Sequence, residues 1–125
     1  MSDTDESLSW FEVGTVEELK SRQCRRLYTP SKQYLALFCV KGSEFYATSA
    51  QCPHANGPLD QGDIEDMGND NYLLTCPMHF YSFDLKTGVS TTGLKLKTYP
   101  TEVRDGKVFV KAPESVSIKS IKSLT

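Results

Sequence analysis

Both histidines of the chain lie within three residues of a cysteine. His54 follows Cys52 in the motif CPH, and His79 follows Cys76 in the motif CPMH, with 21 residues between His54 and Cys76. Thiolates and imidazoles are common metal ligands, so each motif offers one sulfur and one nitrogen donor. The spacing therefore predicts a site in which two loops together hold a metal ion or a metal cluster.

Three kinds of site fit these four residues. The cysteines could be buried thiols or a disulfide, with the histidines nearby by chance. Two thiolates and two imidazoles could hold a structural zinc ion in a closed tetrahedral site. The same four groups could hold a 2Fe–2S cluster in which two cysteines bind one iron and two histidines bind the other.

The residues around the ligands resemble the cluster loops of Rieske proteins, especially the soluble Rieske-type ferredoxins and the small subunits of nitrite reductase. In that family Pro-Leu and Gly follow C-x-H in the first loop, and Phe-Asp and Thr-Gly follow C-P-x-H in the second. This chain has the matching residues Pro58–Leu59, Gly62, Pro77, Phe83–Asp84 and Thr87–Gly88. The resemblance covers residues 10 to 112 and is greatest to the small Rieske iron–sulfur domain-containing proteins of animals.

The resemblance implies one Rieske 2Fe–2S cluster, with Cys52 and Cys76 on the inner iron and His54 and His79 on the outer iron. Two ferric ions, two sulfides and two thiolates make a neutral oxidised centre, whereas four thiolates would leave two negative charges. An electron enters a neutral centre more readily, so the reduction potential lies hundreds of millivolts above that of four-cysteine ferredoxins.

The chain departs from the family pattern in three ways. The gap between the loops is longer, and we place the extra residues in EDMGNDN (residues 65–71) as a polar surface loop. Phe80 follows the second histidine where many relatives have glycine. The loops lack the further cysteine pair of respiratory Rieske proteins, which disfavours that subclass.

High-potential relatives have serine and tyrosine where this chain has Tyr81 and Phe83, which predicts a potential near the low end of the Rieske range, roughly −150 mV.

Composition limits the other possibilities. A chain of 125 residues with a formal charge of −2 is long enough for one domain and gives no reason to expect nucleic acid as a partner. No apolar run approaches the ~20 residues of a membrane-spanning helix. The acidic start MSDTDESLS is unlike a secretory signal, so we expect a cytoplasmic protein whose thiols stay reduced.

Short apolar and β-branched runs predict an all-β fold, a Rieske-type antiparallel β-sandwich with a small loop-built cluster-binding subdomain. We expect a disordered leader over residues 1–9, the domain over residues 10–113 with the subdomain at about 50–90, and a tail over residues 114–125. Thr15 and Glu18 form a candidate capping box, and YLALFCV suits a strand buried on both faces. Asp105–Gly106 predicts a tight hairpin.

No catalytic group accompanies the two motifs, because both histidines already serve as ligands. We therefore expect an electron carrier without its own substrate site, a monomer that passes single electrons from a flavin-containing reductase to an oxygenase or another acceptor. A redox-sensing binding module and a structural zinc domain are the alternatives.

Cys39 is expected to be a core thiol. Cys24 is expected to be a half-exposed strand residue, although Arg25 and Arg26 beside it suggest a reactive thiol as the alternative.

Overall fold

The computed structural model describes residues 8–42, 44–52, 58–77, 81–90 and 93–119. Most of its regular structure consists of short antiparallel strands in three sheets. The first sheet has β1 (Ser9–Thr15), β10 (Lys107–Ala112) and β9 (Thr101–Arg104); the second has β2 (Cys24–Leu27), β3 (Leu35–Val40), β4 (Glu44–Ser49) and β8 (Thr98–Tyr99); the third has β5 (Asp63–Gly68), β6 (Asn71–Thr75) and β7 (Ser82–Asp84). The predicted all-β antiparallel fold is confirmed.

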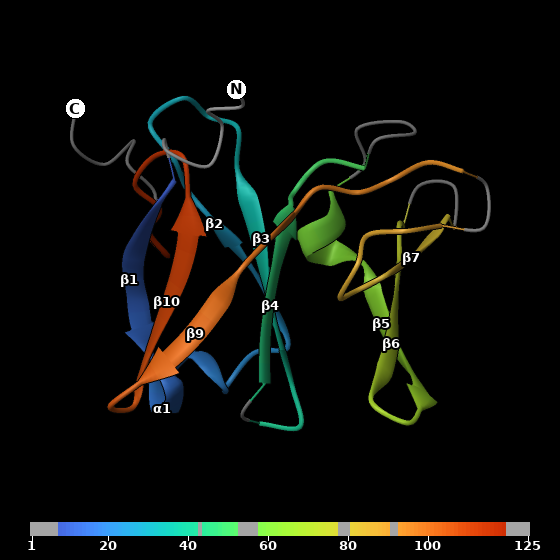
Figure 1. Ribbon diagram of the computed structural model, residues 1–125, viewed down its shortest axis with the longest axis horizontal. Helices are drawn as coiled ribbons and strands as arrows, with labels where there is room; N and C mark the ends of the chain where they lie inside the picture. Colours follow the sequence, from blue (N-terminus) through green and yellow to red (C-terminus); the bar gives the residue numbers. More distant parts are fainter. Residues whose placement is uncertain (1–7, 43, 53–57, 78–80, 91–92, 120–125) are drawn as a thin grey trace.

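The second sheet lies between the other two (Figure 1). Successive side chains of a strand point to opposite faces of its sheet. Along β3, Leu35, Leu37 and Cys39 belong to a first core, shared with β1 and β10. Ala36, Phe38 and Val40 belong to a second core, shared with β6 and β7. All six residues of β3 are buried, which explains why YLALFCV is apolar at nearly every position.

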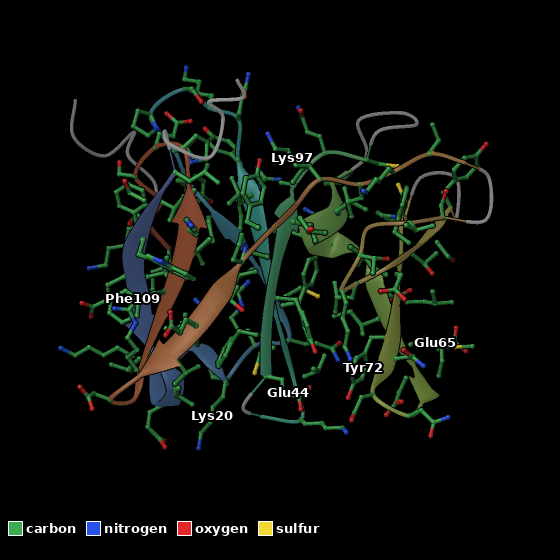
Figure 2. All side chains as sticks on the ribbon, viewed as in Figure 1. Lys20, Glu44, Glu65, Tyr72, Lys97 and Phe109 are labelled. Atoms are coloured by element: carbon green, nitrogen blue, oxygen red, sulfur yellow. The ribbon has the colours of Figure 1, made fainter. Side chains whose placement is uncertain are left out.

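The second core is the part of the fold that contains the candidate ligands. Its buried members are Ala36, Phe38, Val40, Ala50, Cys52, Leu59, Tyr72, Leu74, Cys76, Phe83, Leu85 and Leu96. Figure 2 shows the labelled Tyr72 on the side of the third sheet that faces β4, and Glu65 on the opposite side. The third sheet therefore covers the free face of the second sheet and turns its charged side chains to solvent.

Two local sequence signals fold as predicted. Thr15 caps α1 (Val16–Leu19), where its hydroxyl oxygen accepts a hydrogen bond from the backbone N–H of Glu18 at 3.1 Å. Asp105 and Gly106 form a two-residue turn between β9 and β10, with φ angles of 51° and 75°. A turn with two positive φ angles matches the twist of paired strands, which is why Asp-Gly favours it.

The expectation that residues 65–71 form a surface loop is wrong. Most of this segment belongs to β5, which pairs with β6 as far as Gly68, and the turn itself holds only Asn69 and Asp70. The segment is polar because β5 is an edge strand with its side chains largely exposed, not because it lacks regular structure.

The run LKTYPTEVR also differs from the single strand that its pattern suggests. Pro100 separates β8, in the second sheet, from β9, in the first sheet. Proline has no backbone N–H to donate to a neighbouring strand, so the chain changes sheets at this residue.

Near its C-terminal end the described chain still contributes to the fold. Val116 is buried in the first core, and Ser117 exchanges two backbone hydrogen bonds with Tyr28. Most of the expected leader, residues 1–7, lies outside the described residues, and β1 begins at Ser9. Among the described residues no helix has the length and apolar character needed to cross a bilayer.

Candidate metal centre

The first candidate loop leaves the end of β4 and returns to the 3-10 helix η2 (Leu59–Gln61). Its base is closed by a hydrogen bond of 2.8 Å from the backbone N–H of Leu59 to the carbonyl oxygen of Ala50, and by a bridge between Gln51 and Pro58. Cys52 lies just inside this base and is completely buried. His54 lies outside the described residues.

The second candidate loop joins β6 to β7 and is closed in the same way. The backbone N–H of Cys76 donates to the carbonyl oxygen of Tyr81 at 2.8 Å, and the hydroxyl oxygens of Thr75 and Ser82 lie 3.0 Å apart below it. Cys76 is completely buried at the base of the loop. His79 lies outside the described residues. Each motif thus begins with a buried cysteine at a closed loop base.

A close backbone contact holds the two loop bases together. After η2 the chain passes Gly62 and enters β5, whose first residue, Asp63, pairs with Thr75 at the end of β6. A Cβ atom on Gly62 would lie 2.5 Å from the carbonyl oxygen of Thr75 and 3.2 Å from the Cδ1 atom of Leu74. Only glycine allows this approach, which gives a structural reason for Gly62 in the first motif.

The Thr-Gly pair of the second motif has a similar role. Gly88 has a φ angle of +80°, and an added Cβ would overlap the carbonyl oxygen of Leu96. Gly88 and Leu96 are also joined by a hydrogen bond of 2.7 Å between the Leu96 N–H and the Gly88 carbonyl. Asp84 forms the preceding turn by accepting hydrogen bonds from the backbone N–H groups of Lys86 and Thr87.

The donor set fits a thiolate-bound metal group. Cys52 and Cys76 belong to the same core, and no disulfide joins any of the four cysteines, which disfavours the disulfide alternative for the motif cysteines. Leu59 and Phe83, the apolar residues of the two motifs, are completely buried in that core. Two buried sulfur donors suit an iron–sulfur cluster or a zinc ion. The apolar side chains around them would keep water away from the bound group.

The described residues do not contain a complete ligand set. No group of three or more histidine, cysteine, aspartate or glutamate side chains gathers in that part of the chain. Both histidines lie in segments beyond it. The structure therefore places the two cysteines in one core, and all four predicted ligands remain predictions.

The two remaining cysteines lie outside the two motifs, and Cys24 packs against the edge of the second core. Cys39 is buried in the first core, on the opposite face of β3, as expected. Cys24 is half-buried in β2, and its thiol donates a long hydrogen bond of 3.8 Å to the carbonyl oxygen of Gly62. Burial, and after it the charge of Asp60, raises the pKa of Cys24 to about 11. The reactive-thiol alternative is therefore wrong, because the neighbouring arginines do not outweigh burial.

An ion pair that the motifs do not reveal connects β2 to the first loop. The guanidinium group of Arg26 donates to the carboxylate of Asp60, in η2, at 3.0 and 3.4 Å. The Asp60 side chain is only 11% exposed, so this pair is screened less than a surface pair. Asp60 directly follows the motif residue Leu59, and the pair therefore holds the chain beyond the first loop against the second sheet.

Comparison with known proteins agrees with this geometry. The family model of the Rieske-like 2Fe-2S domain matches residues 9–111. The ferredoxin subunit of 3-phenylpropionate/cinnamic acid dioxygenase from Photorhabdus laumondii is 39% identical over 106 residues, which cover 82% of this chain and 93% of that subunit. The subunit of the same name from Escherichia coli K12 is 39% identical over 84 residues, covering 65% and 74% of the two chains.

Solved structures give the same result. A ferredoxin from Sphingomonas yanoikuyae B1 has a TM-score of 0.67 and 29% identity, covering 84% of this chain and all of that one. A chain from the complex of reduced oxygenase and oxidised ferredoxin in carbazole 1,9a-dioxygenase has a TM-score of 0.70 and 27% identity, covering 84% and 94%. With two buried cysteines at adjacent loop bases and a family match over nearly all described residues, this chain belongs to the Rieske-like 2Fe-2S domain family.

Proposed function

We propose that this protein is a soluble, cytoplasmic electron carrier that holds one Rieske 2Fe–2S cluster through Cys52, His54, Cys76 and His79. The observation that carries the proposal is the burial of Cys52 and Cys76 in the same core, each at the base of a closed loop. Each of these loops also contains one of the only two histidines in the chain. Residues 50–90 would form the cluster-binding subdomain of a monomer.

When bound, such a cluster accepts and releases one electron at a time. The residues of this chain would hold it without offering a place for substrate. Cys52 and Cys76 would bind as thiolates, losing their protons on binding. The surrounding apolar side chains, Leu59 and Phe83 among them, keep water away from the sulfur donors.

The relatives support an oxygenase as the electron acceptor. Two relatives of this chain are ferredoxin subunits of a dioxygenase, and a similar solved structure comes from a complex of an oxygenase with its ferredoxin. We propose that this chain likewise passes electrons to an oxygenase or a comparable acceptor, and receives them from a flavin-containing reductase. The activity then belongs to the assembled system, and this chain is its carrier.

Serine substitutions of the cysteines test the ligand assignment. We expect Cys52→Ser and Cys76→Ser to lose the bound iron and sulfide and the visible absorption of the cluster, because serine is a poor ligand for iron–sulfur clusters. Iron and acid-labile sulfide are measured on purified protein. Cys24→Ser and Cys39→Ser are the matched controls, and both should keep the cluster. Colourless protein that holds one zinc ion instead would contradict the proposal and favour a structural zinc domain.

A second measurement tests the carrier function itself. The reduced protein is mixed anaerobically with an oxygenase of the Rieske type, and its re-oxidation is followed by absorbance. Rapid re-oxidation in the presence of the oxygenase is the expected result, and the reduced protein without the oxygenase is the control. A cluster that forms but is re-oxidised no faster with the oxygenase than without it would contradict the oxygenase as acceptor.

A further inference from the structure

Three of the four arginines of this chain line one hollow on its surface. The chain has arginine at positions 22, 25, 26 and 104 only, and Arg22, Arg25 and Arg26 all border a hollow of about 320 Å³. Its other walls include Asp60, in η2, and Ile118, near the C-terminal end of the described residues. No motif of the cluster loops accounts for this gathering of guanidinium groups.

The hollow follows the open edge of β2. This strand pairs with β3 on one side only. Just beyond the end of β2, Tyr28 exchanges two backbone hydrogen bonds with Ser117. Arg25 and Arg26 are neighbours in the strand, so their side chains start on opposite faces of the sheet. Both can border one hollow because it wraps around the free edge between these faces.

The three arginines differ in how their charges are compensated. Arg26 is paired with Asp60 and stacks over the ring of Tyr34 at 5.4 Å. Arg22 and Arg25, in contrast, form no ion pair with a carboxylate of the described residues within 4.0 Å. The residues that line the hollow carry three guanidinium groups and one carboxylate, a net charge of +2, although the whole chain carries −2. The carboxylates of Glu18 and Asp63 lie outside the lining but act on Arg25 and on Cys24, which also lines the hollow.

Arg25 also carries a buried donor that lacks a partner. One of its terminal nitrogens donates to the backbone carbonyl of Glu18 at 3.4 Å. Its Nε atom is buried and has no hydrogen-bond partner among the described residues. A buried N–H group without an acceptor costs free energy and leaves the guanidinium charge poorly compensated, so an anion beside the Arg25 guanidinium would be stabilising.

The charges around Arg25 favour the binding of an anion. Burial and the nearby charge of Arg22 both lower the pKa of the Arg25 guanidinium, and the carboxylate of Glu18 only partly opposes them. Two like charges held close together repel each other, and an anion between them would relieve this repulsion.

We propose that this hollow binds a phosphate group, which Arg22 and Arg25 contact directly while Arg26, held by Asp60, adds a third positive charge. Arginine presents paired N–H donors that match the oxygens of phosphate, and several arginines around one anion are typical of phosphate recognition. The volume is at the lower end of the range for ligand pockets, which fits inorganic phosphate or the phosphate of a mononucleotide. The site needs no cluster ligand and is independent of the electron-transfer function.

Calorimetric titration of the cluster-loaded protein tests the proposal, with inorganic phosphate, AMP and adenosine as separate probes at constant ionic strength. We expect saturable binding of phosphate, AMP or both, and no binding of adenosine. Tighter binding of AMP would assign the site to a nucleotide, and equal binding would assign it to free phosphate. Arg22→Gln, at an exposed position, should weaken binding roughly tenfold or more, because it removes a charge-assisted contact.

Arg104→Gln is the matched control, since it removes the same charge from the one arginine outside the hollow. It should leave the affinity unchanged. Arg25→Gln should weaken binding as Arg22→Gln does, and its unfolding curve shows whether the protein still folds. Equal weakening by Arg104→Gln and Arg22→Gln would mean non-specific charge attraction and would overturn the proposal. Adenosine binding as well as AMP, or the absence of any saturable binding, would overturn it too.

A direct observation of Arg25 gives a second test. Nitrogen-15 spectra of the arginine Nε–H groups contain one signal for each of four arginines, and the substitutions above assign them. Addition of phosphate should shift the Arg25 signal, because the anion binds beside its guanidinium group, and should leave the Arg104 signal in place. If the Arg25 signal does not move at saturating phosphate, the proposed contact is absent.

Discussion

At the scale of single residues, position and burial separate four cysteines of the same chemical type. Cys52 and Cys76 are buried in the second core at the bases of two loops. Cys39 lies in the first core, and Cys24, in an edge strand, is only half-buried against the second core. Position in the fold, and not the number of cysteines, therefore supports Cys52 and Cys76 as the proposed sulfur ligands.

We expect Cys24 to be a slow nucleophile in the folded protein. Its pKa is raised from 9.0 to about 11, so at neutral pH its thiolate fraction is about a hundredfold smaller than that of an ordinary cysteine. Alkylation of the peptide that contains Cys24, measured by mass spectrometry, should be much slower in native protein than in urea. Equal rates in the two states would contradict the pKa shift.

The same shift has a consequence for stability. Because the folded pKa lies above the unfolded pKa, the contribution of Cys24 to stability is complete below about pH 9 and is lost as the pH rises towards 11. Cys24→Ser has no thiol to ionise at this position. Its unfolding free energy should therefore fall less steeply than that of the wild type across this pH range.

The reduction potential is also set at the residue scale. Phe83 is completely buried in the same core as the two cysteines and has no hydrogen-bond donor. Without a donor to the sulfurs from this position, we expect a potential near the low end of the Rieske range, roughly −150 mV. Redox titration of the purified protein measures it. A potential above about +100 mV would show that another residue supplies the missing hydrogen bonds.

At the scale of elements, close backbone contacts decide which loops can lie side by side. Gly62 brings the start of β5 against the end of β6, and Gly88 brings the turn after β7 against Leu96. Both glycines belong to the motifs that resemble Rieske proteins. Their presence reflects the packing of the chain segments around the site, and neither supplies a ligand.

We expect Gly88→Ala to destabilise the protein clearly more than Gly68→Ala. Both glycines have positive φ angles, +80° and +86°, so both substitutions share a backbone strain of about 1–2 kcal/mol. Only at Gly88 does the added methyl group also meet backbone atoms, which adds roughly 1–3 kcal/mol. Urea unfolding measures the difference. Equal unfolding free energies for the two variants would contradict the tight contact with Leu96.

Sequence patterns predicted those elements whose signals are local. The Asp105–Gly106 turn and the Thr15 cap need only neighbouring residues, and both are confirmed. β5 was missed because its polar residues form a strand only through pairing with β6. Similarly, the break at Pro100 depends on the presence of two different sheets for its two flanking strands. A local sequence pattern does not show which distant strand a segment will pair with.

At the scale of the whole molecule, three layers of sheet place the two sulfur donors in one core. The ligand pairs Cys52–His54 and Cys76–His79 were predicted from residue type, spacing and family resemblance. The structure places the two cysteines in one core, and the ligand set itself stays a prediction. The arginine-lined hollow was not predicted, because Arg26 and Asp60 are 34 positions apart and meet only in the folded chain. Charge patterns along a sequence do not show which distant groups will share one surface.

The central claim is that two histidines and two cysteines bind one 2Fe–2S cluster. Pulsed EPR of the dithionite-reduced protein, prepared with nitrogen-15 in its histidines only, tests this claim most directly. We predict couplings to two directly bound nitrogen-15 nuclei, one from His54 and one from His79, and the loss of one of them in His79→Ala if that variant retains a cluster. A reduced cluster whose spectrum shows no histidine nitrogen coupling, or a preparation that contains no iron, would contradict it.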